Sequence, residues 1–232
     1  PEEINRVVTD HVSTHLYCPS DVAVTNLRNE GVVEGVHLVG DVMHDVIRRE
    51  LALLGAENPV GDRCGCEPGY VLATIHRPGN TDDPRRLGEI LAAVAELAAM
   101  GRPVIWPVHP RARPLLTEWS VPAGVHLVEP ATYRETVALL RDARSVLTDS
   151  GGLQKEAYWM ATPCVTVRPS TEWVETVDEG WNRLVDADHD DIVDATMTAV
   201  PGTSNREAYG TGDAAARIVE LVESMVSGAS SR

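Results

Sequence analysis

The sequence predicts an α/β fold in which parallel sheets are covered by helices on both faces, the doubly wound arrangement. Apolar strand-like runs alternate with amphipathic helical patterns along most of the 232 residues. Strand runs such as 71–75 (Val-Leu-Ala-Thr-Ile) are almost continuously apolar, as is typical of strands buried on both faces. Loops rich in Gly, Pro and Asp separate the two kinds of segment. These observations favour parallel strands that are joined by crossover helices.

The first 54 residues contain three expected helices and two expected short strands. A helix is expected over residues 4–14, because Ile4 and Val8 recur on one face. Ser20 or Asp21 is expected to cap the second helix, which runs to Gly31. The expected strands cover residues 16–18 and 36–39, and the third helix covers residues 42–54.

Residues 55–68 carry Gly, Pro, Asp and Cys without periodicity, which predicts a linker. After this segment the alternation of strands and helices becomes regular. The expected strands are 70–74, 103–107, 125–128, 145–147, 164–167 and 183–185, and the expected helices are 85–100, 113–119, 133–141, 153–160 and 190–200.

Composition excludes several classes of partner. The chain has 20 basic and 35 acidic residues and a net charge of -15, which repels nucleic acid and anionic membrane surfaces. The longest apolar helical stretch, 90–100, is too short to cross a bilayer, and no signal peptide opens the chain. We therefore expect a cytoplasmic protein with neither a nucleic-acid nor a membrane partner. Because Pro1 is not Met, we expect a piece of a longer protein.

Ligands of doubly wound sheets bind beyond the carboxyl ends of the strands, so residues that follow strands are the candidates for chemistry. The segment 147–156 ends a strand at Asp149 and continues as Ser150-Gly151-Gly152 into a helix. Free N–H groups at such a helix start suit a diphosphate, and Glu156 is close enough along the helix to reach a ribose diol. A tight turn with a serine cap explains the same residues equally well.

Two further loops carry cationic or potentially cationic side chains. His76 and Arg77 follow one strand, and His109 follows the next strand along the chain. Imidazolium and guanidinium groups both donate to phosphate oxygens, although a single pair of this kind is usually solvated surface. Together the three loops favour a small phosphate-bearing ligand. The acidic cluster 186–191 is expected to cap a helix, and no metal site is expected.

Seven segments together resemble the UDP-N-acetylglucosamine 2-epimerase family in residue type, order and spacing. They are Pro-Glu-Glu-Ile-Asn-Arg (1–6), His-Leu-Val-Gly-Asp (37–41), Thr-Ile-His-Arg-Pro-Gly-Asn (74–80), Pro-Val-His-Pro-Arg (107–111), Leu-Thr-Asp-Ser-Gly-Gly-Leu-Gln-Lys-Glu (147–156), Ser-Thr-Glu-Trp-Val-Glu (170–175) and Gly-Trp-Asn-Arg-Leu-Val (180–185). The resemblance extends over essentially the whole chain.

The resemblance implies a glycosyltransferase-B-like fold of two Rossmann-like domains, the first incomplete, with the active site in the cleft between them. Residues 1–54 would then be a remnant of the N-terminal domain and residues 55–68 the linker. Residues 69–205 would be the UDP-binding domain, and residues 206–232 a C-terminal helix and tail. Roughly the first third of the family's chain would be missing here, and a homodimer is expected.

The resemblance also implies reversible C2 epimerisation of UDP-N-acetylglucosamine to UDP-N-acetylmannosamine, through elimination and re-addition of UDP and without a cofactor. Glu2 falls on a family carboxylate and His76 on the family histidine beside the diphosphate, which makes both catalytic candidates. The expected substrate-binding residues are Arg77, His109, Ser150, Gly151, Gly152 and Glu156. The alternatives are a hydrolysing epimerase that releases ManNAc and UDP, a glycosyltransferase, and a non-catalytic nucleotide-sugar-binding module.

Three positions depart from the family pattern. Thr136 replaces an aromatic residue that packs near the uracil in many members. Trp173 stands where the family often has Arg, and Gly79 stands where Glu is common. These departures imply nucleotide contacts that differ in detail, and a substrate that is UDP-N-acetylglucosamine or a relative of it.

Overall fold

The computed structural model describes the backbone of residues 2–229 and the side chains of residues 3–227. The chain divides into two compact units. Unit 1 combines the residues up to Ala52 with those from Glu207 onward, and unit 2 comprises Leu53–Arg206. Each unit is described by itself below.

Unit 1 contains a two-stranded parallel sheet, in which Leu16 pairs with Val36. Ser20 caps α2 as predicted, because its hydroxyl accepts a hydrogen bond from the Ala23 N–H at 3.3 Å. The elements of this unit are α1 (Glu2–Val12), β1 (Leu16–Cys18), α2 (Asp21–Asn29), β2 (Val36–Leu38), α3 (Val42–Leu53) and α11 (Ala214–Ala229).

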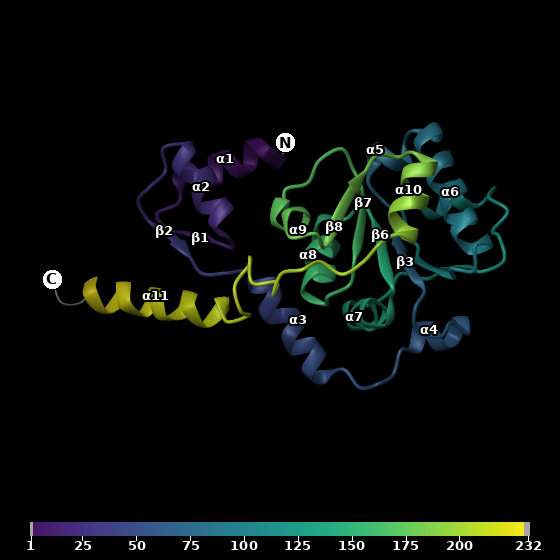
Figure 1. The fold of residues 1–232 in the computed structure, drawn as a ribbon. Helices are drawn as coiled ribbons and strands as arrows, with labels where there is room; N and C mark the ends of the chain where they lie inside the picture. The colour runs from purple at the N-terminus through teal and green to yellow at the C-terminus, as the bar shows by residue number, and fades with distance from the viewer. Residues whose placement is uncertain (1, 230–232) are drawn as a thin grey trace. The chain divides into compact units, whose positions relative to one another are not determined.

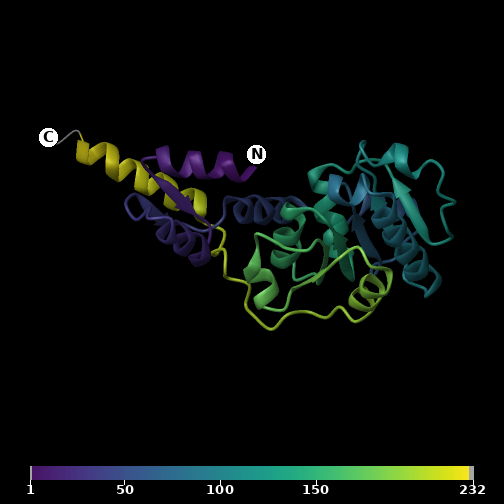
Figure 2. The ribbon, with the colours of Figure 1, turned by 90° about the horizontal axis from the view of Figure 1, so that it is seen from above.

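The C-terminal helix α11 belongs to the same unit as the N-terminal segment, and both views show the two together (Figures 1 and 2). The carboxylate of Asp45 on α3 accepts hydrogen bonds from the N–H groups of Ala214 (3.1 Å) and Ala215 (2.7 Å). A carboxylate at this position satisfies free N–H groups at the start of α11 and complements the helix dipole. The helix at the end of the sequence is therefore anchored to α3.

Unit 2 is a six-stranded parallel sheet with the strand order β5-β4-β3-β6-β7-β8. Numbered along the unit, this is the order 3-2-1-4-5-6 of nucleotide-binding doubly wound folds, with its reversal point between β3 and β6. The strands are β3 (Val71–Thr74), β4 (Val104–Pro107), β5 (Val125–Val128), β6 (Ser145–Thr148), β7 (Cys164–Val167) and β8 (Asn182–Val185). The helices are α4 (Pro59–Cys64), α5 (Pro78–Thr81), α6 (Pro84–Ala99), α7 (Tyr133–Asp142), α8 (Gly151–Trp159), α9 (Val174–Asp178) and α10 (His189–Met197), with a 3-10 turn at Arg113–Leu116.

Both faces of this sheet are covered by helices, as the apolar strands predict (Figure 1). Side chains alternate between the faces, so Val71 and Ala73 pack with α6 and α10. Tyr70 and Leu72 belong to the core on the opposite face, with residues of α4, α7 and α8. The covered sheet gives the loops at its carboxyl edge a rigid base.

The structure differs from the sequence prediction in three short segments. The predicted linker 55–68 contains α4, which Asn58 caps through a hydrogen bond from the Gly61 N–H and which ends at Gly65 in the left-handed region (φ 63°). The loop after β3 contains the single turn α5, and α9 follows the loop after β7. All three helices have six residues or fewer, too few for an amphipathic period to emerge from the sequence.

Candidate functional site

The reversal point of the sheet brings two predicted loops together. Thr74 pairs with Thr148 in the parallel register of β3 and β6, and their hydroxyl oxygens lie 2.6 Å apart. His76 and Ser150 each stand two residues beyond this pair, so they emerge at the same edge of the sheet. Residues separated by about seventy positions in the sequence thus meet at the place where doubly wound folds bind nucleotides.

A pocket of about 290 Å³ opens at this edge. Its polar lining includes five of the predicted site residues, His76, His109, Ser150, Gly152 and Glu156. The remaining lining residues are Leu72, Thr74, Pro107, Pro130, Ala131, Thr136 and Leu153. An apolar wall with a few convergent polar groups is typical of a small-ligand site.

His76 is held between two neighbours. Its Nδ1 lies 3.4 Å from the Asp149 carboxylate, and its ring stacks on the ring of His109 with centroids 5.3 Å apart. Burial lowers the pKa of His76 below its usual value, Asp149 acts in the opposite direction, and His109 and Arg77 lower it further. The lowered pKa favours the neutral imidazole near pH 7 in the free protein.

The start of α8 forms the predicted diphosphate cradle. Ser150 is its N-cap, and the serine hydroxyl makes no capping hydrogen bond to the helix, so it remains available to a ligand. Free N–H groups of the first turn and the positive end of the helix dipole face the same region. The Arg77 guanidinium is near, since its Nη2 lies 3.7 Å from where a Cβ on Gly151 would stand. A diphosphate placed here would meet backbone donors and a cation together.

Glu156 lies one turn further along α8 and is only 8% exposed. Burial raises the pKa of this carboxyl, while a hydrogen bond with Tyr133 and the nearby charge of Lys155 act in the opposite direction. A buried acceptor at the wall of a pocket suits the hydroxyl groups of a ribose, which would replace the water that burial removes.

The second catalytic candidate, Glu2, is the first residue of α1 in unit 1. Its side chain lies outside the described residues. Arg77 and Gly151 flank the pocket without being among its lining residues, and Arg77 also borders a neighbouring pocket of about 400 Å³ with Arg86 and Arg168.

The family of this chain follows from comparison with known proteins. The sequence model of the family described as UDP-N-acetylglucosamine 2-epimerase matches residues 1–223. The chain belongs to the UDP-N-acetylglucosamine 2-epimerase family. Among its relatives is the UDP-2,3-diacetamido-2,3-dideoxy-D-glucuronate 2-epimerase of Pseudomonas aeruginosa, which is 43% identical over 96% of this chain and 63% of its own length. A UDP-N-acetylglucosamine 2-epimerase homolog of Methanococcus maripaludis is 39% identical over 97% of this chain and 65% of its own length.

Solved structures place the fold in the same family. The crystal structure of Methanocaldococcus jannaschii UDP-GlcNAc 2-epimerase in complex with UDP-GlcNAc and UDP is 33% identical, with a TM-score of 0.83 over 96% of this chain and 64% of that chain. The Neisseria meningitidis enzyme bound to UDP-GlcNAc is 26% identical, with a TM-score of 0.83 over 97% of this chain and 65% of that chain. The predicted glycosyltransferase-B-like α/β fold class is confirmed. This chain spans slightly less than two thirds of the length of these relatives.

Two departures from the family pattern lie at the site. Trp173 Nε1 would stand 3.3 Å from a Cβ on Gly151, so the indole borders the cradle. The ammonium of Lys155 lies 3.7 Å from the centroid of the Trp173 ring, a cation–π geometry. Thr136 lines the pocket itself. Gly79 borders the neighbouring pocket beside Arg77.

A buried polar network ties α8 to the loop that carries Trp173, and the sequence alone did not indicate it. The Gln154 Oε1 accepts hydrogen bonds from the Thr171 hydroxyl at 2.6 Å and from Asn182 Nδ2 at 3.0 Å. Its amide group donates to the Ser150 carbonyl at 3.3 Å. Gln154 is fully buried, so these bonds fix the loop against the helix that begins the cradle.

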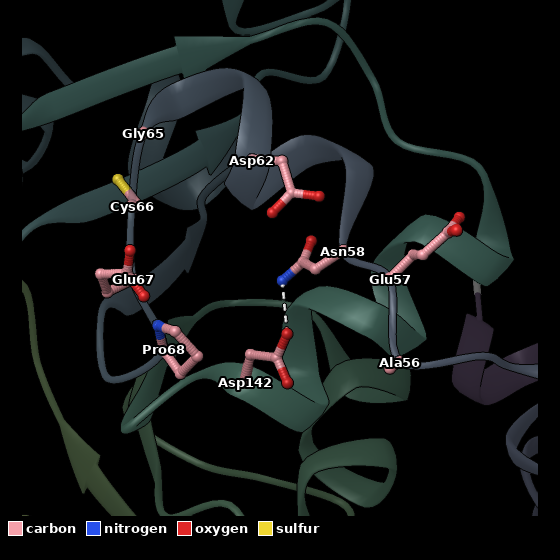
Figure 3. A pocket seen from close by; sticks show the side chains of 9 residues that line it. All are labelled: Ala56, Glu57, Asn58, Asp62, Gly65, Cys66, Glu67, Pro68 and Asp142. Atoms are coloured by element: carbon pink, nitrogen blue, oxygen red, sulfur yellow. Dashed lines mark hydrogen bonds between the residues drawn. The ribbon is translucent and has the colours of Figure 1, made fainter.

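Another pocket, of about 330 Å³, lies beside α4 and is lined by carboxylates, among them Glu57, Asp62 and Asp142 (Figure 3). Its most buried polar side chain is Asn58, which donates to the Asp142 carboxylate at 2.8 Å and to the Tyr70 hydroxyl at 2.9 Å. These bonds join α4 to α7 and to Tyr70, the residue before β3, so Asn58 has a structural role.

Within residues 3–227, no cluster of His, Cys, Asp or Glu side chains has a geometry that would hold a metal ion. The acidic segment 186–191 caps α10 as predicted, since the Asp188 carboxylate accepts a hydrogen bond from the Asp191 N–H. Over residues 2–229, no helix is both long enough and apolar enough to span a bilayer.

Proposed function

We propose that the protein to which this chain belongs interconverts UDP-N-acetylglucosamine and UDP-N-acetylmannosamine by elimination and re-addition of UDP. The observation that carries the proposal is the pocket at the reversal point of the sheet, where His76, His109, Ser150 and Glu156 converge. Family membership and the relatives that bind UDP-GlcNAc or UDP support the same ligand.

The chemistry requires a base that removes the C2 proton and donor groups that stabilise the negative charge on the departing UDP. The proton at C2 of the sugar is poorly acidic, so its removal must be coupled to departure of the diphosphate. We assign proton removal to the carboxylate of Glu2. His76, Arg77 and the N–H groups of Gly151 and Gly152 stabilise the charge that develops on UDP, while Glu156 binds the ribose.

The test of this assignment uses the full-length gene product, with solvent deuterium incorporation at C2 and epimer formation both followed by NMR. Glu2→Gln should lower both rates together, by on the order of 10²-fold or more, because a carboxamide cannot act as a base. Glu3→Gln is the matched control, since Glu3 is an exposed neighbour on α1 that pairs with Arg6. Wild-type exchange in Glu2→Gln would remove Glu2 from the mechanism.

The same assay separates the alternative activities. UDP-ManNAc is the product of a non-hydrolysing epimerase, whereas free ManNAc with UDP indicates a hydrolysing enzyme. Transfer of the sugar to an acceptor would identify a glycosyltransferase. UDP binding without turnover by the full-length protein would leave a nucleotide-sugar-binding module.

A second candidate substrate is UDP-2,3-diacetamido-2,3-dideoxy-D-glucuronate. It is favoured by the 43% identity to a protein described as a 2-epimerase of that sugar nucleotide. The reaction at C2 is the same for both sugars, and the difference lies at C3 and C6. Competition between the two UDP-sugars in one reaction mixture gives the ratio of kcat/KM directly. Because the two UDP-sugars share the UDP group, a kcat/KM ratio far from one would reflect recognition of the sugar at C3 and C6. The sugar with the higher kcat/KM would be the preferred substrate.

We also propose that the protein acts in the cytoplasm and has no nucleic-acid partner. Its net charge of -15 supports the second point, because a phosphate polymer would be repelled. The expected homodimer stays a prediction, which light scattering of the full-length protein would test.

A further inference from the structure

Asp149 is the residue around which the loop after β3 is built. Its side chain is fully buried at the end of β6. The carboxylate accepts hydrogen bonds from the His76 N–H, 3.1 Å from each oxygen, and from the Arg77 N–H at 2.9 Å. Asn80 Nδ2 donates to the same carboxylate at 3.1 Å. The Asp149 carboxylate thus holds the backbone of His76 and Arg77 beside the start of α8.

The same carboxylate faces the imidazole of His76. Asp149 Oδ1 lies 3.4 Å from Nδ1, at one edge of the ring, and His109 covers one face of the ring. The ring is therefore constrained at an edge and at a face, while His76 still lines the pocket together with Ser150 and Gly152.

We propose that Asp149 is a positioning residue, which holds the His76 imidazole as the tautomer protonated at Nδ1 and so presents Nε2 to the diphosphate. An unprotonated Nδ1 would direct its lone pair at a carboxylate, whereas Nδ1–H directs a donor at it. Nε2 is then the nitrogen that takes up a proton when a diphosphate arrives. The inference rests on the proposed function, in which His76 meets UDP.

The separation of 3.4 Å is longer than an optimal hydrogen bond. Catalytic hydrogen bonds are often long in free enzymes and shorten when the ligand is bound. The hydrogen bonds from the N–H groups of His76 and Arg77 hold the Asp149 carboxylate beside the ring before any ligand arrives.

The direct test is the tautomer of His76 in the free full-length protein, measured by NMR after labelling of histidine with ¹⁵N and assigned by comparison with His76→Ala. We expect Nδ1 to give the resonance of a protonated nitrogen and Nε2 that of an unprotonated one at a pH above the His76 pKa. The opposite pattern would overturn the proposal. This measurement needs no substitution at Asp149, so it decides the question even if variants at that position fail to fold.

The kinetic test is a double-mutant cycle with Asp149→Asn and His76→Ala. Asp149→Asn should lower kcat by roughly 10²-fold in the wild-type background, because the misplaced imidazole no longer meets the charge on UDP. In the His76→Ala background it should lower kcat by about twofold or less, since there is no imidazole left to position. Equal losses in both backgrounds would mean that Asp149 serves the fold alone, and the proposal would fail.

A matched control loosens the same loop without touching the ring. The Thr81 hydroxyl donates to the Arg77 carbonyl at 3.1 Å, and Thr81→Val removes that bond while nearly preserving shape. Thr81→Val should keep the wild-type tautomer of His76.

If the full-length protein neither binds UDP nor turns over a UDP-sugar, the proposed function fails, whereas the tautomer measurement still decides the role of Asp149.

Discussion

The imidazole of His76 stacks on the imidazole of His109 with ring centroids 5.3 Å apart and ring planes inclined by 28°. The two residues follow different strands, β3 and β4, and meet because those strands are neighbours in the sheet. A positive charge on His109 would repel one on His76, and His109 accordingly lowers the pKa of His76. A diphosphate bound beside His76 would act in the opposite direction, because negative charge favours the imidazolium.

This arrangement predicts that UDP binding takes up a proton. The groups of unit 2 that act on His76 are Asp149, His109 and Arg77, with Glu156 across the pocket. The pKa of His76 lies below its usual value in the free protein, and the charge of UDP raises it, so affinity should increase as the pH falls toward 6. Calorimetric titration at about pH 7.5 in two buffers of different ionisation enthalpy measures the uptake.

His76→Ala is the control for protons that UDP itself binds. This variant should lose most of the uptake and bind UDP more weakly, by about 2–4 kcal/mol if His76 acts like other donors to developing charge. Identical uptake in the wild type and the variant would assign the proton to another group.

A second prediction concerns the cradle. Gly151→Ala should weaken UDP binding by at least about tenfold, or 1.4 kcal/mol, because the new Cβ stands between the helix start and the ligand. The new Cβ would also lie 3.3 Å from Trp173 Nε1, which must then give way slightly, and at an ordinary contact distance of 3.7 Å from Arg77 Nη2. Calorimetric titration with UDP measures the change.

Gly88→Ala is the matched control, since Gly88 lies within α6 and a Cβ there meets nothing within 4 Å. This substitution should leave the Kd for UDP unchanged and raise the free energy of unfolding by about 1 kcal/mol, the usual gain from Gly to Ala in an exposed helix. Undiminished affinity in Gly151→Ala would contradict the cradle assignment.

A third prediction is that one substitution at Glu156 stabilises the fold at high pH but weakens UDP binding. Because burial raises the pKa of this carboxyl, the folded state binds its proton more tightly than the unfolded chain does. The associated stability is complete at low pH and is lost as pH rises through the folded-state pKa. Glu156→Gln should therefore raise Tm at pH 8 but hardly at pH 4. It should also weaken UDP binding by about 1.5–3 kcal/mol, the worth of hydrogen bonds to a charged acceptor.

Glu135→Gln on α7 provides a control of opposite sign. Hydrogen bonds from Thr132 lower the pKa of Glu135, so its ionised form supports folding at neutral pH. Gln at this position should lower Tm slightly above pH 5 and leave the affinity for UDP unchanged. A Tm of Glu156→Gln below that of the wild type at pH 8 would contradict the account of Glu156.

The sequence predicts the edge of the sheet at which the site lies, because apolar strand runs end where the polar loops begin. His76, His109 and Ser150 each follow such a run, and the structure brings all three to one pocket. The short helix α4 carried signals that were readable in advance, an Asn-Pro start at residues 58–59 and Gly65 at its end. Its brevity made the segment look aperiodic.

Other features depend on contacts that no local pattern encodes. Asp149 looks like an ordinary strand end, and its role emerges only from the pairing of β6 with β3, which places His76 against it. Trp173 reaches the cradle through the packing of the loop after β7, held by Gln154 and Thr171. Such relationships are set by tertiary register, which sequence periodicity leaves open.

The last prediction concerns unit 2 by itself. Residues 53–206 contain a six-stranded sheet with helices on both faces, together with every UDP-binding candidate from His76 to Glu156. A chain limited to these residues should therefore fold cooperatively and give a dispersed NMR spectrum, since its core is internal.

This isolated unit should bind UDP weakly and lose that binding on substitution of His76 by Ala. It should form no UDP-ManNAc and release no glucal, because Glu2 belongs to unit 1. A chain that does not fold would show that unit 2 depends on the rest of the protein. Epimer formation by residues 53–206 would mean that the base lies within unit 2, and Glu2 would then have no place in the reaction.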